Sequence, residues 1–365
     1  MQGMRAAIID AVPGRPTIGE IEIDDPSPGE VLVRTVACGV CHSDLSSING
    51  SITMFSPPFV LGHEPAGIVE AVGPDVRHLR SGDHVVGCLV GYCGECSGCL
   101  SGEALRCTGQ GTTNRSPEAP PRLRRGDQAV DQHCGLAGFA ELFLVGHHNV
   151  VRIDKTLPLE QACMLGCGVL TGVGAVLNTT PIRPGATVVV IGCGGVGLAA
   201  IQGARLSYAG RVVAVDLDDA KLKLAERCGA TDLVNAADAD PVDAVSSLLP
   251  GGADYVYEAI GRPATTQQAI AMTAMFGTCT VVGMMPPTEQ VVISGMDLMM
   301  GKTVRQSVMG SPRPAVDIPR LVEHALAGRL DLDVMVEGTR PIDELPTALD
   351  DLEAGRVLGR TVVTF

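Results

Sequence analysis

Two hydrophobic patterns follow one another along the chain. Residues 5–37 hold short stretches in which apolar and polar positions alternate, separated by turns rich in proline and glycine. A repeat of two residues is typical of strands that bury one face. From residue 187 onward, short apolar runs alternate with segments in which apolar side chains recur every three or four positions. The chain is therefore predicted to begin as an irregular β region and to continue as a doubly wound parallel α/β sheet.

The same patterns predict elements outside these two blocks. Short strands are expected at residues 6–9, 18–23, 31–36, 68–72, 84–87 and 139–145. Helices are expected within residues 158–179, 263–275, 318–327 and 343–354, and a last strand at 361–365. Residues 108–135 show no clear period and contain several prolines and charges, so we expect a long surface loop with the basic cluster 122–125 in solvent.

A glycine motif lies where the second pattern begins. Gly192, Gly194 and Gly197 have the spacing G-x-G-x-x-G, between the apolar run 188–191 and a helical pattern. In a dinucleotide-binding turn, the first glycine makes the tight turn, the second lets the backbone approach a pyrophosphate, and the third lets helix and strand pack. Asp216 follows Gly197 by 19 residues, at the end of the next apolar run, and is placed to bind ribose hydroxyls. The segment is therefore predicted to bind a dinucleotide, with its phosphates at the helix N-terminus.

Four cysteines form a compact motif in residues 93–107. Their spacing is C-x2-C-x2-C-x7-C, with glycines in the turns between them; they are Cys93, Cys96, Cys99 and Cys107. Four thiolates complete a tetrahedron around zinc and leave no open position. We therefore predict a structural zinc site, since a redox C-x-x-C pair would not need four cysteines.

A second set of metal-binding residue types is spread more widely. Cys41 and His63 offer a thiolate and an imidazole, and Cys167 is a candidate third ligand. A catalytic zinc site needs three protein ligands and an open position, and Asp44 could accept the second ring N–H of His63. Taken alone, Cys41 is interpreted equally well as a small buried hydrophobic residue.

Composition and charge narrow the class of protein. The chain of 365 residues carries a net charge of −14, which argues against nucleic acid and anionic membranes as partners. No apolar run reaches the length of a membrane span and the N-terminus has no secretory pattern, so a cytoplasmic protein is expected. The 13 cysteines, an odd number, favour metal ligands and buried thiols over a disulfide framework.

Together these motifs resemble the zinc-containing medium-chain alcohol dehydrogenase family over nearly the whole chain. The matching segments are GVCHSD at 39–44, GHE at 62–64, the four-cysteine stretch, LGCG at 165–168, the glycine motif and LGRT at 358–361. The resemblance implies a mostly-β, GroES-like catalytic domain that binds zinc, formed by residues 1–168 and 309–365. Residues 169–308 would form a Rossmann domain that binds NAD.

The resemblance also implies roles for individual residues. Cys41, His63 and Cys167 would bind the catalytic zinc, with Glu64 as an occasional ligand and Asp44 beside them, and the four cysteines would bind the structural zinc. The NAD-binding residues implied are His42, Thr171, Gly192, Gly194, Gly195, Val196, Gly197, Asp216, Lys221 and Arg360. Within this set, Asp216 and Lys221 would hold the adenosine ribose, His42 and Arg360 the pyrophosphate, and Thr171 and Val196 the nicotinamide. Ser43 would pass the alcohol proton to a ribose hydroxyl, whereas many relatives have a histidine where this chain has Ser46.

The implied reaction is hydride transfer between a primary or secondary alcohol and NAD+. By alignment to the family, the substrate pocket would be lined by Leu89, Cys134, Met284 and Val308, which favours medium or bulky apolar alcohols. The alternatives are a mycothiol-type formaldehyde dehydrogenase, a nicotinoprotein that retains its NAD, and a non-catalytic relative that binds dinucleotide. Gly111 stands where glutathione-dependent enzymes have arginine, which speaks against glutathione. The long loop after Cys107 resembles that of dimeric members, so a homodimer is expected.

Overall fold

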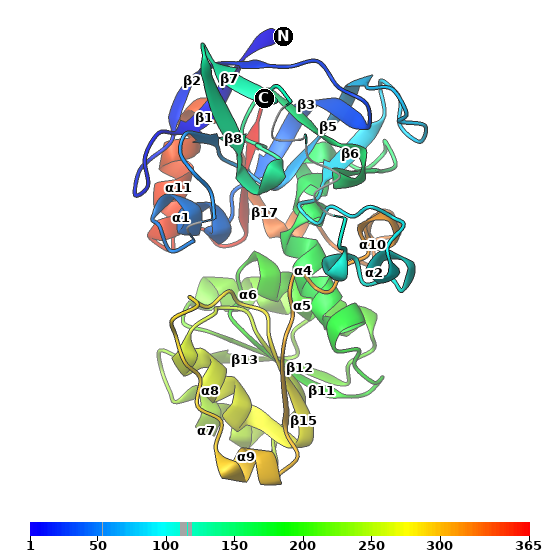
Figure 1. The fold of residues 1–365 in the computed structure, drawn as a ribbon. Coiled ribbons are helices and arrows are strands. Elements are labelled where there is room, and N and C mark those ends of the chain that lie inside the picture. The colour runs from blue at the N-terminus through cyan, green and yellow to red at the C-terminus, as the bar shows by residue number, and fades with distance from the viewer. Residues whose placement is uncertain (53, 110–114, 116–118) are drawn as a thin grey trace. The chain divides into compact units, whose positions relative to one another are not determined.

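The chain divides into two compact units. The computed structural model describes residues 1–52, 54–109, 115 and 119–365. The first unit comprises Met1–Cys167, Arg313–Gly328 and Val336–Phe365, and the second comprises Gly168–Pro312 and Arg329–Met335. In Figure 1 the first unit runs from blue to green and ends in red, and the second is green to orange.

The first unit is built on a barrel and a sheet. The closed barrel has the strand order β1 (Gln2–Ile9), β2 (Thr17–Ile23), β7 (Leu123–Arg125), β8 (Gln128–Gln132) and β4 (Phe59–Val60). The seven-stranded sheet has the order β10 (Val150–Arg152), β6 (His84–Gly87), β5 (Pro65–Val72), β3 (Glu30–Gly39), β18 (Arg360–Thr364) and β17 (Val336–Pro341), with β9 (Leu142–Gly146) also paired to β3. Strand β3 pairs with three neighbours and is buried along most of its length. The C-terminal end of β3 therefore offers a rigid support for the residues that follow it.

Short helices connect and cover these strands. They are α1 (His42–Ile48), α2 (Ser97–Leu100), η1 (Ala104–Arg106), η3 (His133–Gly135), η4 (His147–Asn149), α3 (Leu159–Ala162), η5 (Cys163–Gly166), α10 (Pro314–Leu326), η8 (Ile342–Glu344) and α11 (Leu345–Glu353). Helix α1 begins after Cys41, whose backbone N–H donates to the Asp44 carboxylate at 2.9 Å. An acidic side chain in the first turn is favourable because it meets unpaired N–H groups and the positive end of the helix dipole. One apolar core joins α1, α11 and the strands, with Phe59, Leu61 and Phe139 fully buried.

The second unit is a doubly wound sheet. Its parallel strands have the order β13 (Asp232–Asn235), β12 (Arg211–Asp216), β11 (Thr187–Ile191), β14 (Ala253–Glu258), β15 (Thr273–Val281) and β16 (Thr303–Gln306). The helical segments are α4 (Gly168–Gly174), the π-helical turn η6 (Ala175–Thr179), α5 (Gly195–Leu206), α6 (Asp219–Cys228), α7 (Pro241–Leu248), α8 (Pro263–Met272), α9 (Gly295–Met299) and η7 (Asp333–Met335). The order reverses between β11 and β14, and ligands of such sheets bind outside the carboxyl ends of the strands at this point. The predicted fold class is confirmed.

The structure corrects one expectation about the first unit. Residues 108–135 were expected to be a surface loop, but their described part contains β7, β8 and η3. Arg122 is only 8% exposed, because its guanidinium Nε donates to the Glu30 carboxylate at 2.7 Å. The period was missed because β7 and β8 are short and their pairing with β2 and β4 is long-range.

Several predicted helices also differ in their bounds, among them the one expected at 318–327, which is α10 and begins at Pro314. The helix expected at 263–275 ends at Met272, where the chain turns directly into β15. The helix expected at 343–354 begins at Leu345, after a short 3-10 turn.

Among the described residues, no single helix is long and apolar enough to cross a membrane. Two segments bent by 56° from one another, Leu159–Gly166 and Gly168–Thr179, reach that length and apolar composition only when taken together.

Candidate metal centres and dinucleotide loop

Four distant residues of the first unit meet in one buried cluster. The ligand atoms of Cys41, His63, Glu64 and Cys167 all lie within 4.8 Å of one another. Sheet pairing brings the first three together, because Gly39 N donates to Glu64 O at 3.1 Å where β3 ends and β5 begins. Cys167 follows η5, which packs against β5 and β6. The cluster therefore combines two thiols, an imidazole and a carboxylate, all of them buried.

The hydrogen bonds of His63 leave one ring nitrogen ready for a metal. Its Nδ1 lies 2.9 Å from Asp44 Oδ1, and both side chains are fully buried. A carboxylate is an acceptor, so the ring proton belongs on Nδ1 and the lone pair on Nε2. The Nε2 atom is buried without a hydrogen-bond partner in the described chain. An orphaned lone pair facing two thiols fits a zinc ligand set.

The thiols of this cluster are electrostatically distinct. The Cys167 thiol donates to the Cys41 sulfur and holds the pKa of Cys41 well below its ordinary value, although burial opposes this. The positive charge of Arg360 and the His63 ring lower the Cys41 pKa further. A stabilised thiolate is the form in which cysteine binds a metal.

Arg360 lies beside this cluster. It was expected to bind the pyrophosphate of NAD, which stays a prediction. In the structure its Nη2 lies 3.0 Å from Glu64 Oε1, and its Nη1 donates to Val40 O at 3.1 Å. Burial raises the pKa of Glu64 to about 7, although Arg360 opposes this. Glu64 thus has one oxygen paired with Arg360, and its Oε2 has no partner in the described chain.

One histidine near the cluster was missed by the sequence analysis. His133 Nδ1 lies 3.3 Å from Asp44 Oδ1, and its ring meets that of His63 edge-on at 5.2 Å between centroids. The adjoining Cys134, expected as a pocket residue, forms with these two histidines a second group whose ligand atoms lie within 4.8 Å. No motif marked His133, because it is 70 residues from His63 in a segment expected to be a loop.

The four cysteines of residues 93–107 form a second cluster. The Sγ atoms of Cys93 and Cys107 lie 3.5 Å apart, those of Cys96 and Cys99 3.6 Å, and those of Cys93 and Cys99 3.9 Å. Thiolates at tetrahedral corners around zinc would be about 3.8 Å apart, from the usual Zn–S bond. Backbone N–H groups of Cys99 and Thr108 donate to the Cys96 sulfur and lower its pKa to about 5. The cluster therefore fits a closed zinc site, and the short helices α2 and η1 carry it.

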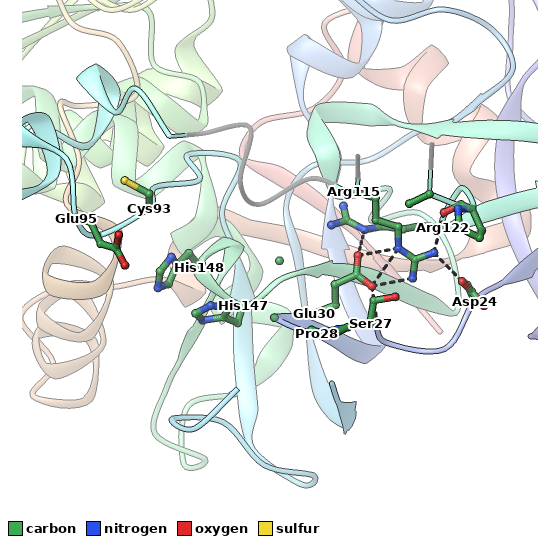
Figure 2. Close-up of a pocket in the computed structure, with 15 residues that line it drawn as sticks. Asp24, Ser27, Pro28, Glu30, Cys93, Glu95, Arg115, Arg122, His147 and His148 are labelled. Atoms are coloured by element: carbon green, nitrogen blue, oxygen red, sulfur yellow. Dashed lines mark hydrogen bonds and ion pairs between the residues drawn. The ribbon is translucent and has the colours of Figure 1, made fainter. Parts of the chain in front are cut away.

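A cavity of about 740 Å³ lies beside this cysteine cluster. Figure 2 shows His147 and His148 near Cys93 at one end of it, and Arg115 with Glu30 at the other. His148 Nδ1 lies 2.6 Å from Tyr92 O, next to Cys93, and its ring stacks on the Tyr92 ring at 4.7 Å. Arg115 donates to Glu30, the first residue of β3, at 2.7 Å. The cavity therefore has the cysteine cluster with His147 and His148 at one end, and the ion pair of Arg115 with Glu30 at the other.

In the second unit, the three motif glycines meet three different requirements. Gly192 has a φ of +91°, a left-handed conformation that a side chain would strain. A Cβ on Gly194 would meet nothing within 4 Å, so the backbone faces open space there. A Cβ on Gly197 would collide with Gly192 O, which shows why the helix needs glycine at this position. The loop therefore leaves open space at Gly194, at the N-terminus of α5, where backbone N–H groups could bind a pyrophosphate.

The Asp216 carboxylate is fixed at the end of β12. It accepts hydrogen bonds from Cys193 N at 2.7 Å, Leu217 N at 2.8 Å and Asp218 N at 3.2 Å. These bonds tie the end of the second strand to the glycine loop. Gly195 and Val196 begin α5, and Lys221 lies in α6 after Asp216. Thr171 is buried on α4, which packs against α5 in the same unit.

The remaining predicted residues are less constrained. His42 is exposed at the start of α1, and Ser43 follows it, half-buried. The Ser43 hydroxyl makes no hydrogen bond with the described chain, and its carbonyl accepts from Ser47 Oγ at 2.9 Å. Of the expected pocket residues, Leu89 is half-buried in the first unit, whereas Met284 and Val308 are 55% and 52% exposed in the second. Gly111 lies outside the described residues.

Comparisons with known proteins agree with both halves of the chain. Residues 27–155 match the alcohol dehydrogenase GroES-like domain, and residues 195–326 match the zinc-binding dehydrogenase family. The chain is 35% identical over 368 residues to an S-(hydroxymethyl)glutathione dehydrogenase of Haemophilus influenzae, covering 99% of this chain and 97% of that protein.

Solved structures give the same result. An alcohol dehydrogenase zinc-binding domain protein from Burkholderia ambifaria has a TM-score of 0.94 at 34% identity, covering 100% of this chain and 99% of that one. The benzyl alcohol dehydrogenase of Acinetobacter calcoaceticus has a TM-score of 0.93 at 32% identity, with 100% of both chains covered. The chain therefore belongs to the zinc-containing medium-chain alcohol dehydrogenases, oxidoreductases for which zinc and NAD are the expected cofactors.

Proposed function

We propose that this chain oxidises medium-sized or bulky apolar alcohols, primary or secondary, with NAD+. The observation that carries the reaction is the orphaned Nε2 of His63 among the thiols of Cys41 and Cys167. Two compact units divided near residue 168 agree with a zinc-binding catalytic domain and an NAD-binding domain, and we propose these roles for them.

The first unit would hold the metal that polarises the alcohol. Cys41, His63 and Cys167 would be its ligands, and Glu64 an occasional fourth. When bound, zinc supplies a Lewis acid that polarises the substrate oxygen, and NAD+ supplies the hydride acceptor. Asp44 holds the His63 ring with Nε2 free, and Arg360 compensates the negative charge that collects beside the thiolates. The four cysteines would hold a structural zinc with no position for a substrate.

The second unit binds the nucleotide. The N–H groups at the start of α5 and the open space at Gly194 receive the pyrophosphate, with Gly195 and Val196 in the first turn. Asp216 is oriented by three backbone N–H groups and is placed to accept from ribose hydroxyls. Lys221, Thr171, His42 and Arg360 keep the NAD-binding roles that the resemblance implies.

Ser43 is proposed to carry the alcohol proton away. Its hydroxyl is uncommitted in the described chain and lies two residues beyond Cys41. A hydroxyl can accept the proton and donate its own to a ribose hydroxyl in one step. Ser46 cannot hold that proton as an imidazole would, so the path continues through hydroxyl groups or water.

The substrate class rests on apolar lining and on a relative. The expected lining offers few polar groups, since it consists of Leu89, Cys134, Met284 and Val308. In an apolar pocket, each methylene group added to the substrate strengthens binding by about 1 kcal/mol. The similar Acinetobacter protein is named a benzyl alcohol dehydrogenase. The second candidate is a thiol-bound hydroxymethyl substrate, because relatives of this chain are named S-(hydroxymethyl)glutathione dehydrogenases.

A substrate screen tests the two candidates. The purified enzyme is assayed with NAD+ and ethanol, octanol, benzyl alcohol, or formaldehyde premixed with glutathione or mycothiol. We expect kcat/KM to rise from ethanol to octanol and benzyl alcohol. Turnover only with a thiol adduct would favour the second candidate. NAD that survives dialysis, with turnover that needs an added hydride acceptor, would identify a nicotinoprotein instead.

We also propose a cytoplasmic homodimer. All 13 cysteines are free, as expected in a reducing compartment. Strand β16 is an edge of the six-stranded sheet, and nearby Phe276, Leu298 and Met299 are 65–78% exposed. Exposed apolar side chains at an unpaired edge favour association of two copies. Sedimentation of the wild type and of Phe276→Asp tests this, since the dimer should weaken in the variant.

A further inference from the structure

Glu258 places a buried carboxylate at the end of β14. The residue is fully buried, and its Oε1 accepts from Ile260 N at 2.9 Å and from Gly261 N at 2.8 Å. The Thr265 hydroxyl lies 2.8 Å from the same oxygen. The other oxygen, Oε2, has no hydrogen-bond partner in the described chain. The hydrogen bonds of this carboxylate within the described chain therefore all go to the segment that follows its own strand.

The turn formed by residues 259–261 depends on this carboxylate. The N–H groups of Ile260 and Gly261 converge on one point, and successive N–H groups of this kind form a concavity that binds an anion. A buried N–H group without an acceptor costs free energy, so the turn keeps this shape only while an oxygen occupies the concavity. Glu258 supplies that oxygen from within the chain. The length and direction of its side chain therefore set the position of the turn.

The turn 259–261 lies between the glycine motif and the segment after β15. A Cβ on Gly192 would come within 2.6 Å of Ile260 Cγ1, so the Ile260 side chain packs directly on the first motif glycine. On the other side, a Cβ on Gly261 would come within 2.6 Å of Met284 O. The side chains of Ile260 and Met284 are 42% and 55% exposed. The turn thus sets the position of two exposed apolar side chains beside the dinucleotide loop.

The place of this turn in the sheet indicates which part of a dinucleotide it faces. The strand order reverses between β11 and β14, and each half of such a sheet holds one nucleotide of the ligand. Asp216 ends β12, in the half that receives the adenosine ribose. The turn after β14 begins the other half, which receives the nicotinamide nucleotide.

We propose that Glu258 is a positioning residue of the NAD site: it fixes the turn 259–261 and, through it, the surface that Ile260 and Met284 offer to the nicotinamide nucleotide. Because Glu258 is fully buried, it acts through the turn and not by contact with the cofactor. The inference rests on the proposed function, in which the second unit binds NAD. It adds a residue that the glycine motif does not contain.

The affinities for NADH and for AMP test the inference without an activity assay. The fluorescence of NADH reports its binding, and calorimetry reports that of AMP, which occupies the adenosine half alone. In Glu258→Met we expect the Kd for NADH to rise about 10-fold, because the loosened turn must be ordered when the cofactor binds. The Kd for AMP should stay within about twofold, since other N–H groups hold Asp216. Equal weakening of both ligands would overturn the inference.

Two further variants separate the length of the side chain from its charge. Glu258→Gln keeps the length and an oxygen for both N–H groups, and its amide nitrogen takes the place of the unpartnered Oε2. Glu258→Asp keeps the charge but is one methylene group shorter. The inference predicts wild-type NADH affinity for the Gln variant and about 10-fold weaker binding for the Asp variant. The reverse order would overturn it, because charge and not position would then be required. If Glu258→Met fails to fold, this comparison decides alone.

Asp254 provides the matched control, because it is a carboxylate near the other end of the same strand. Its Oδ2 accepts from Thr187 N and from Thr187 Oγ1, both at 2.8 Å. Asp254→Met should lower the free energy of unfolding but bind NADH and AMP like the wild type. The amides of Ile260 and Gly261 should exchange hydrogen faster in Glu258→Met and at the wild-type rate in Asp254→Met. Weaker NADH binding by Asp254→Met to the same degree would overturn the inference.

The wild type distinguishes failure of this inference from failure of the proposed function. A wild type that binds neither NADH nor AMP would overturn the proposed function. A wild type that binds both, with a Glu258→Met variant of equal NADH affinity, would overturn only this inference.

Discussion

Arg360 and Glu64 form a buried ion pair in which Nη2 lies 3.0 Å from Oε1. The arginine comes from the last strand of the chain, and the glutamate follows the candidate metal ligand His63. Only 5% of the arginine side chain and none of the glutamate side chain is exposed. The C-terminal strand thus contributes Arg360 to the candidate metal site as well as pairing in the sheet.

Breaking this ion pair should destabilise the first unit. Removing one partner of a buried pair leaves an uncompensated charge, which costs about 3–5 kcal/mol. We therefore expect Arg360→Met to lower the free energy of unfolding by that amount, measured by urea denaturation. The double variant Arg360→Met with Glu64→Gln should recover much of the loss. A single variant as stable as the wild type would contradict the structural role of the pair.

The two metal sites should respond differently to substitution. Cys96→Ser removes one of four thiolates from a closed site that contributes to folding, so Tm should fall by about 10 °C, or roughly 3–5 kcal/mol. Cys41→Ser should leave the melting curve near that of the wild type and abolish turnover. Thermal melts, zinc content and activity are measured together on both proteins. An inactive Cys96→Ser variant of wild-type stability would show that this site is not structural.

Asp216 should select NAD+ over NADP+. A 2′-phosphate would approach a carboxylate that is fixed by three backbone hydrogen bonds, and like charges in contact cost several kcal/mol, or about 100-fold or more. The ratio of kcat/KM for the two cofactors measures this preference, and Asp216→Asn should reduce it about tenfold. Asp219→Asn is the control, since Asp219 contacts Asn235 and should leave the ratio unchanged. Comparable wild-type values for both cofactors would refute the assignment.

Ser43 should be needed for proton transfer. Ser43→Ala should lower kcat by about 10²-fold, the scale of one lost acid–base step, whereas Ser43→Thr keeps the hydroxyl and should keep activity. Ser46→His should change the pH profile by adding an imidazole, with Ser46→Ala as its control. A deuterated alcohol shows whether hydride transfer limits the rate. If it does, and Ser43→Ala still turns over like the wild type, Ser43 is not on the proton path.

His147 should make stability depend on pH. Burial, with the nearby His148 and His78, lowers the pKa of His147 to about 4, below the value of about 6.5 in an unfolded chain. As pH falls, His147 therefore binds its proton in the unfolded state before it does so in the folded state. The contribution of the neutral His147 to the free energy of unfolding is complete above about pH 6.5 and is lost as pH falls toward 4. Urea midpoints between pH 7.5 and 4.5 should fall less steeply in His147→Phe than in the wild type. Parallel curves for the two proteins would exclude this contribution.

The amino-acid sequence by itself determined the parts of this protein whose residues are close together in the chain. The four cysteines lie within 15 residues and the glycine motif within six, so their spacing already predicts their chemistry. The parallel sheet was predicted for the same reason, because each strand–helix unit shows its period locally and right-handed crossovers restrict the order. The family was recognisable because several such local motifs occur in one chain.

Only the tertiary structure decided which distant residues share a site. The turn after β8 places His133 beside Asp44. The pairing of β18 with β3 places Arg360 beside Glu64. The strands β7 and β8 were expected to be a loop, since three to five residues are too few to show a period and their partners lie far away in sequence. Strand pairing and burial act between segments that no local pattern connects, and they also decide which polar atoms lose water and must find a partner. For this reason the metal ligands and the contact of Asp44 with His63 were predicted from motifs, whereas the positions of Arg360 and His133 beside this cluster appeared only in the folded chain.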